Sequence, residues 1–209
     1  MPVFEKITYL QKEDFEASLE IYTNAFPSNE RQPLDVIRER VSSGYNEAYI
    51  GRIDGQVAFM ALLWPLKNTE FILLDYMATH PGHRGKNIAS AFLQSMKPIL
   101  EKEKKYFVLE VEDPAYGDNT AQREKRLALY QRNGAKVLKN INYLLPALEG
   151  STPTEMVLMI FPDYKNGKID APIVKKLIVQ IYKELYNKDE SEALQNPSLR
   201  EAPDQIELI

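Results

Sequence analysis

Residues 71–93, "FILLDYMATHPGHRGKNIASAFL", place the strongest constraint on how this chain can fold. The segment begins with a run that is apolar at almost every position, which is typical of a strand buried on both faces in the middle of a sheet. A turn follows, and apolar residues then recur at helical spacing. The segment therefore predicts a central strand that passes directly into a helix. We expect the helix to run from about Gly85 to Glu103, kinked or shortened at Pro98.

The turn at residues 84–87 has the chemistry of an anion site. At the start of a helix, unpaired backbone N–H groups and the positive end of the helix dipole favour phosphate oxygens. Gly85 lets the backbone approach a ligand closely, and Asn87 tolerates left-handed geometry better than other non-glycine residues. Arg84 and Lys86 add positive charge. An ordinary turn with solvated cations is the simpler interpretation, and local physics alone favours it.

Other motifs do not fit this turn. A Walker loop needs glycine where the chain has His80, and serine or threonine where it has Asn87. The dinucleotide-binding pattern G-x-G-x-x-G does not occur in the chain. His80 and His83 lie together in the turn, but there is no cysteine in the chain and no acid between the two histidines. We therefore predict no metal site and no metal cofactor.

The amino-acid composition excludes several classes of protein. The chain has 209 residues, enough for one domain with a terminal appendage, and 44% of them are hydrophobic. Acidic residues outnumber basic ones 30 to 26, which argues against a nucleic-acid partner. The absence of cysteine excludes disulfides and a cysteine nucleophile. There is no secretory pattern and no apolar run of the ~20 residues that cross a bilayer, so we predict a cytoplasmic protein without a membrane partner.

The remaining periodicity gives the order β-α-α-β-β-β-α-β-α-β-β. Asp54-Gly55, between two apolar runs, is the strongest hairpin signal in the chain. Gly134 is well placed as the C-terminal stop of a helix. This order predicts an α/β fold with a mixed sheet and helices on both faces.

Residues 163–209 differ in character from residues 1–162, and we predict that they follow the first domain as a separate segment. The stretch "APIVKKLIVQIYKELY" repeats apolar residues every four positions, which predicts an amphipathic helix. We expect this helix to dock on its own domain, and pairing across a homodimer is the alternative. The tail from residue 187 is polar and acidic, a composition that favours poor order.

With its flanks, the stretch "LDYMATHPGHRGKNIASAFL" resembles the acetyl-CoA-binding motif of the GNAT N-acetyltransferase superfamily. That motif is a strand, a short turn and then R/Q-x-x-G-x-G/A at the start of a helix, carried here by Arg84, Asn87 and Ala89. Asn87 stands where the central glycine is expected. Because the backbone N–H binds the phosphate, this departure leaves the motif usable.

A second stretch, "KRLALYQRNGAKV", is similar to the family signature L-Y-x-x-x-G-F. Leu129, Tyr130 and Gly134 match it, and Ala135 replaces the aromatic residue. The two signatures occur in the family's order, with one strand between them. Together the resemblance covers about residues 3–162 and points to a bacterial branch of the superfamily with no assigned substrate.

The resemblance implies a mostly antiparallel mixed sheet that splays between two central strands, with the pantetheine of acetyl-CoA in the gap. The end of the strand would offer backbone groups to the pantetheine, and a backbone N–H, that of Met77, would polarise the thioester carbonyl. Amides of the turn would hold the diphosphate. The implied cofactor-binding residues are Met77, Ala78, Thr79, Arg84, Gly85, Lys86, Asn87, Ile88 and Ala89.

The implied activity is transfer of an acetyl group to a primary amine of a small molecule or peptide, by direct attack in a ternary complex. A base must take a proton from the amine. Asp75, in an otherwise apolar strand, is the first candidate because burial should raise its pKa, and a purely structural acid is nearly as good an interpretation. Glu110 and Glu112 are alternatives. Tyr130 is the candidate acid that protonates the departing thiolate.

The acceptor site is expected near the loop at residues 27–33. Glu30 and Arg31 could orient a charged substrate, although an exposed salt bridge is the simpler role for such a pair. Tyr143 could form another wall. Two rival functions stay open: a non-catalytic acyl-CoA-binding sensor or scaffold, and a binder of another nucleotide.

Overall fold

The computed structural model describes residues 2–148, 153–194 and 197–209. By their internal contacts the residues form two compact units. The first comprises Met1–Pro65 and Ile72–Ile99, and the second comprises Leu66–Phe71 and Leu100–Ile209. The sequence predicted a different division, between a family domain at residues 1–162 and a C-terminal segment at residues 163–209. That boundary stays a prediction.

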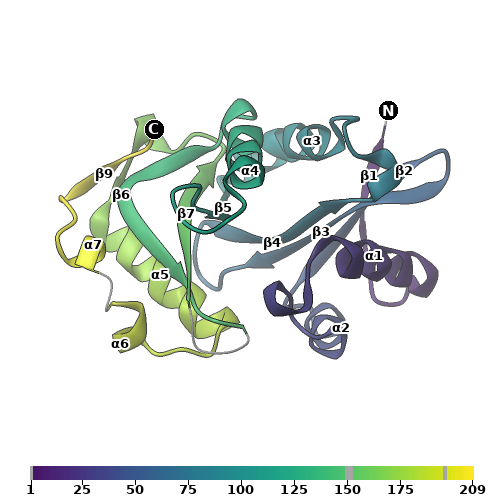
Figure 1. Cartoon of the computed structure of the whole chain (residues 1–209), viewed down its shortest axis with the longest axis horizontal. Coiled ribbons are helices and arrows are strands. Elements are labelled where there is room, and N and C mark those ends of the chain that lie inside the picture. The colour runs from purple at the N-terminus through teal and green to yellow at the C-terminus, as the bar shows by residue number, and fades with distance from the viewer. Residues whose placement is uncertain (1, 149–152, 195–196) are drawn as a thin grey trace. The chain divides into compact units, whose positions relative to one another are not determined.

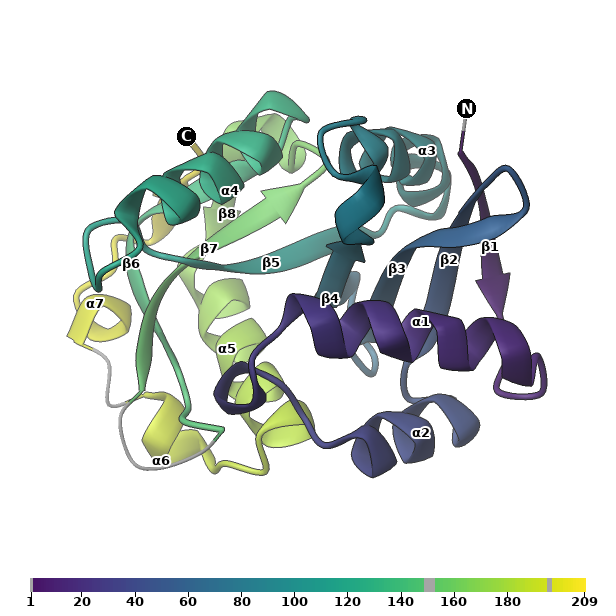
Figure 2. The ribbon, with the colours of Figure 1, turned by 45° about the vertical axis from the view of Figure 1, so that its right-hand side comes forward.

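The first unit is built on four antiparallel strands in the order β1-β2-β3-β4, which lie side by side in Figures 1 and 2. Its elements are β1 (Val3–Ile7), α1 (Lys12–Ala25), a 3-10 turn (Ser28–Glu30), α2 (Leu34–Ser42), β2 (Glu47–Ile53), β3 (Gln56–Pro65), β4 (Phe71–Thr79), a second 3-10 turn (Pro81–His83) and α3 (Ile88–Glu103). The expected hairpin is confirmed, because Asp54 and Gly55 link β2 to β3 at φ values of 50° and 81°. Two successive positive φ values give the turn that matches the twist of paired strands.

Helices cover both faces of this sheet. On one face α1 lies across β3 (Figure 2), and the core there includes Phe15, Tyr22 and Ile37. On the other face Phe92 of α3 packs edge-on or tilted against Phe4 and Phe59, with ring centroids 5.4 and 4.9 Å apart. The alternation of side chains along each strand supplies one apolar set to each face. None of the described helices is long and apolar enough to cross a bilayer.

The second unit has three antiparallel strands in the order β5-β7-β6. Its elements are β5 (Tyr106–Glu112), α4 (Thr120–Arg132), β6 (Lys136–Leu145), β7 (Thr154–Phe161), a 3-10 turn (Lys165–Gly167), β8 (Lys168–Asp170), α5 (Ala171–Leu185), α6 (Glu190–Ala193), α7 (Pro197–Arg200) and β9 (Gln205–Glu207). Gly134 follows α4 at φ 96°, as expected for a helix stop. The predicted class, α/β with a mostly antiparallel sheet and helices around it, is confirmed. The splay between two central strands stays a prediction.

The C-terminal helix is confirmed as α5, and Leu177, Ile181 and Leu185 of its predicted stripe are buried. The expectation of a poorly ordered tail is wrong for the described residues after 196. There β9 pairs with β8, and the backbones of Ile209 and Val137 exchange two hydrogen bonds. Ile206 and Leu208 are buried, and this burial stabilises the end of the chain. The sequence did not predict it because most of the neighbouring residues are polar.

The expected limits of α3 need one correction, at the start of the helix. The helix begins at Ile88 instead of near Gly85, because Gly85 and Asn87 have φ values of 78° and 56°, which a right-handed helix does not accommodate. The helix ends at Glu103 as expected, and Pro98 does not shorten it. Met96 and Leu100, on either side of the proline, are both buried.

Candidate active site

The turn between β4 and α3 exposes its backbone. Gly85, Lys86 and Asn87 are all exposed, and a Cβ placed on Gly85 would meet no other atom within 4 Å. Left-handed geometry at Gly85 and Asn87 rotates successive N–H groups, an arrangement known to form anion-binding concavities. Asn87 therefore adopts the conformation that glycine would adopt at this position.

The hydrogen bonding of the backbone N–H groups differs along this turn. Among the described residues, none accepts a hydrogen bond from the backbone N–H of residues 85–89. The amide of Arg84 is different, since it donates to the carbonyl of Pro81 at 3.3 Å. The amide cradle, as we call the N–H groups of residues 85–89, thus has no acceptor among the described residues and lies at the positive end of α3.

Side chains of the turn brace its shape. The backbone N–H of His80 donates to Ala58 of β3 at 2.9 Å, and the ring of His80 accepts from the N–H of Gly82. Arg84 Nε lies 3.4 Å from the carbonyl of Thr79, and it ties the turn to the end of β4. Lys86 Nζ lies 3.3 Å from His83 Nδ1. Both histidines therefore have contacts that hold the turn.

The strand residues predicted to face pantetheine lie at the end of β4. Met77, Ala78 and Thr79 pair with Ala61, Met60 and Phe59 of β3. From Thr79 back to Tyr76, each residue of β4 pairs with one residue of β3. Asp75 has no partner in the pairing, because the next pair joins Leu63 to Leu74, so Asp75 forms a bulge. Bulges re-aim side chains and are frequent beside active sites.

Asp75 is a buried acid with two polar partners. Its Oδ2 lies 3.7 Å from Arg40 Nη1 and accepts a hydrogen bond from Asn46 Nδ2 at 3.3 Å. Burial raises its pKa from 3.8 to about 6, although the Arg40 charge and the Asn46 hydrogen bond act in the opposite direction. Arg40 in turn lies over the ring of Trp64, 5.0 Å from its centroid. The raised pKa suits proton transfer, whereas the contacts suit a structural acid.

The raised pKa of Asp75 predicts that it lowers stability at neutral pH. The folded protein binds the proton more tightly than the unfolded chain, so the free energy of unfolding should rise as pH falls from about 7 to about 4. Relative to Asp75→Asn, which has no titrating group there, the wild type should gain up to about 3 kcal/mol over this range. Urea unfolding of both proteins at several pH values measures the difference. If the free energy of unfolding changed with pH in the same way for both proteins, the raised pKa of Asp75 would be contradicted.

The loop at residues 27–33 is tied to β4 through Gln32. The hydroxyl of Tyr22 donates to the Gln32 carbonyl at 3.0 Å, and the Gln32 N–H donates to the hydroxyl of Tyr76 at 3.2 Å. Arg31 Nε is buried and has no hydrogen-bond partner among the described residues, while Glu30 is exposed. The loop thus contacts the residue next to Asp75, but the roles predicted for Glu30 and Arg31 stay predictions.

Tyr130 lies on α4 and is 9% exposed. Burial raises the pKa of its hydroxyl, against a smaller effect of the Arg126 charge. The hydroxyl forms no hydrogen bond with any described residue. A hydroxyl that stays protonated and has no acceptor in the described part of the chain suits a proton donor, but the contacts do not test that role.

The two glutamates of β5 have different partners. Glu112 forms ion pairs with Arg123 and Arg126 at 3.0 and 2.7 Å. Glu110 accepts hydrogen bonds from two tyrosines, Tyr143 on Oε1 and Tyr186 on Oε2. Sequence spacing could place Glu110 and Glu112 on one strand but could not identify these partners. The structure brings two predicted site residues, Glu110 and Tyr143, into contact.

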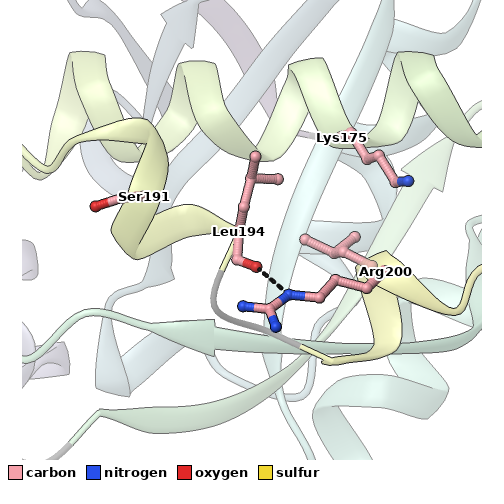
Figure 3. Close-up of a pocket in the computed structure, with 5 residues that line it drawn as sticks. Lys175, Ser191, Leu194 and Arg200 are labelled. Carbon is pink, nitrogen blue, oxygen red and sulfur yellow. Dashed lines mark hydrogen bonds between the residues drawn. The ribbon is translucent and has the colours of Figure 1, made fainter.

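A cavity of about 370 Å³ lies in the second unit and holds none of the predicted site residues. Figure 3 shows Lys175 on α5 and Arg200 beside the carbonyl of Leu194, to which Arg200 Nε donates at 3.1 Å. Ser191 and Leu199 complete the lining.

The fold and the amide cradle define an α/β protein with a strand-turn-helix unit whose turn leaves N–H groups without an acceptor among the described residues. A model of the acetyltransferase (GNAT) family matches residues 7–134. The chain therefore belongs to the GNAT acetyltransferase family, as its two signatures indicated. A sequence comparison with curated proteins gives no match.

Solved structures share the fold. A protein from Bacteroides thetaiotaomicron described as a GNAT-family acetyltransferase has a TM-score of 0.75 at 22% identity, covering 90% of this chain and 99% of its own. An acetyltransferase-like protein of Salmonella typhimurium, solved with acetyl-CoA, has a TM-score of 0.57 at 15% identity, covering 79% and 95%. The ribosomal-protein-S18-alanine N-acetyltransferase of Escherichia coli has a TM-score of 0.54 at 19% identity, covering 78% and 94%. Identities this low show the fold alone.

Proposed function

We propose that this protein transfers an acetyl group from acetyl-CoA to a primary amine of a small molecule or peptide. The observation that carries the proposal is the amide cradle, whose N–H groups have no acceptor among the described residues. A diphosphate would supply acceptors for these groups and negative charge for the helix terminus. Relatives solved with acetyl-CoA or CoA, from Salmonella typhimurium and Bacillus subtilis, support this cofactor.

The proposed reaction is direct attack of the amine nitrogen on the thioester carbonyl carbon. The backbone N–H of Met77 stabilises the negative charge that develops on the carbonyl oxygen. A new C–N bond forms, the C–S bond breaks, and the amine proton passes to a carboxylate, for which Asp75 and Glu110 are the candidates. Tyr130 gives its proton to the thiolate. No covalent relay through cysteine is available, since the chain contains none.

The wider assignments belong to the same proposal. Residues 1–162 form the acyl-CoA-binding domain, and residues 163–209 are its C-terminal addition. The protein acts in the cytoplasm on a small or peptide amine, without nucleic acid, membrane or metal, and a homodimer stays open. Glu30, Arg31 and Tyr143 are proposed to contact the acceptor.

A thiol-release screen tests this function. Acetyl-CoA is incubated with the protein and with spermidine, tyramine, lysine or a peptide with a free N-terminus, and the freed CoA thiol is detected with a thiol reagent. Because the protein has no cysteine, the signal comes from CoA alone. We expect release above the background with at least one amine. Binding of acetyl-CoA with no release for any amine would favour the sensor, and preferential binding of ATP would favour another nucleotide ligand.

A further inference from the structure

Arg31 carries a positive charge that has no partner among the described residues. It lies between the 3-10 turn Ser28–Glu30 and α2, and the residue is half-buried. Its Nε is buried without a hydrogen-bond partner, and its side chain forms no ion pair in the described part of the chain. Loss of hydration without a new acceptor raises the free energy of a charged group. A bound ligand with an anionic oxygen would offset this cost.

The backbone on both sides of Arg31 is fixed. Before it, the N–H of Glu30 closes the 3-10 turn with a backbone hydrogen bond of 3.0 Å. After it, the carbonyl of Gln32 accepts from the hydroxyl of Tyr22 at 3.0 Å, and its N–H donates to the hydroxyl of Tyr76 at 3.2 Å. Arg31 therefore belongs to a segment that is held to α1 and β4, so less conformational entropy is lost when its guanidinium binds a ligand.

Arg31 lies close to the part of β4 that is proposed to bind the thioester. Burial raises the pKa of the Tyr22 hydroxyl to about 12, and the Asp75 charge raises it further while the Arg31 charge lowers it. Both charges are therefore near this hydroxyl. Tyr76, which bonds the segment that carries Arg31, directly precedes Met77. All these residues belong to the first compact unit, so a ligand held by Arg31 needs no residue of the second unit.

The chemistry of Arg31 favours a carboxylate. A guanidinium presents parallel N–H groups in one plane, and the two oxygens of a carboxylate accept them as a pair. A phosphate would bring up to two negative charges near the Asp75 carboxylate. Arg40, a second cation, already lies 3.7 Å from Asp75 Oδ2. The charges around Arg31 thus fit a ligand group with one negative charge better than one with two.

We propose that Arg31 binds a carboxylate of the acceptor, so that the substrate is an amine that also carries a carboxylate, as an amino acid or a short peptide does. This inference rests on the proposed acetyl transfer and narrows its acceptor. The guanidinium holds the carboxylate, and the amine nitrogen of the same molecule then faces the thioester at Met77. An amine without a carboxylate, such as spermidine or tyramine, lacks this anchor.

The first test compares acceptors that differ only in the carboxylate. Thiol release from acetyl-CoA is measured with the twenty amino acids, a dipeptide, the C-terminal amide of each, and spermidine, tyramine and phosphoethanolamine. Each amide keeps the amine and the size of its parent but removes the negative charge, and asparagine and glutamine serve as the side-chain amides of aspartate and glutamate. We expect the best acceptor to carry a carboxylate, with kcat/KM at least about 10-fold above that of its amide.

The second test changes Arg31 itself. For Arg31→Gln we expect the KM of the best acceptor to rise about 10-fold, the KM of acetyl-CoA to stay within about twofold, and the preference for acid over amide to disappear. Arg31→Lys keeps the charge without the planar fork and should retain part of the preference. Arg38→Gln is the matched control, because Arg38 lies in the same unit and is paired with Glu16 at 2.8 Å. It should keep the wild-type preference.

The outcomes separate this inference from the proposed function. A best acceptor without a carboxylate, or equal rates for an acid and its amide, overturns the inference and leaves acetyl transfer standing. The same holds if Arg31→Gln keeps the preference or loses rate equally with acid and amide. If thermal unfolding shows that Arg31→Gln is not folded, the wild-type comparison and Arg31→Lys decide. A wild type that binds acetyl-CoA but releases no thiol with any amine refutes the proposed function, and the inference with it.

Discussion

Replacing Tyr130 with phenylalanine is expected to lower the turnover of acetyl-CoA by about 100-fold and to leave its affinity within about threefold. The variant removes only the hydroxyl, which we propose protonates the CoA thiolate. Burial raises the pKa of this hydroxyl, so it carries its proton at neutral pH. Because it makes no hydrogen bond with a described residue, its removal should change the free energy of unfolding little.

The measurement is kcat from thiol release together with the dissociation constant of acetyl-CoA from calorimetry. Tyr164→Phe is a matched control, since this buried tyrosine of the same unit bonds Glu70, which has no proposed catalytic role. Tyr130→Phe with wild-type turnover would remove the acid role. A parallel rise in the dissociation constant would instead place Tyr130 in binding.

Replacing Asn87 with valine should weaken acetyl-CoA binding about 20-fold, whereas replacing it with glycine should change binding less than about threefold. Asn87 has a φ of 56°, a conformation that costs a β-branched residue roughly 1–2 kcal/mol and glycine nothing. Relief of that strain would rotate the peptide groups of the amide cradle away from one another. Asn87 is exposed, so the glycine variant loses no packing.

Calorimetry with acetyl-CoA on both variants gives the comparison, and thermal unfolding shows whether each is folded. Equal dissociation constants for the valine and glycine variants would mean that the left-handed backbone at residue 87 does not matter for binding. Weak binding by the glycine variant alone would show that the Asn87 side chain contacts the cofactor.

The features that the sequence predicted correctly are local. The hairpin at Asp54-Gly55 and the stop at Gly134 depend on backbone preferences of one or two residues, which a sequence displays directly. The turn before α3 follows the same rule, since asparagine and glycine are the residues that accept a positive φ. The start of α3 was placed too early because the helical spacing of apolar residues does not reveal where the backbone geometry changes.

The contacts that the sequence could not predict join distant residues. Asp75 contacts Asn46 in the turn before β2 and Arg40 on α2, and no periodic pattern connects them. Tyr186 reaches Glu110 across a separation of 76 residues. A tyrosine at the end of an amphipathic helix looks like ordinary packing, because its hydroxyl partner depends on how the helix docks. Polar partners of buried acids therefore required the structure.

The central claim is that the N–H groups of residues 85–89 bind the diphosphate of acetyl-CoA. Titrating acetyl-CoA into the ¹⁵N-labelled protein tests it directly, by following the amide signals of Gly85, Lys86 and Asn87. We expect these signals to move together and to saturate at the stoichiometry found by calorimetry, while the amide signal of Gly44, before β2 at the opposite end of the sheet, stays in place. Saturable acetyl-CoA binding that leaves the Gly85–Asn87 signals unmoved would contradict the claim.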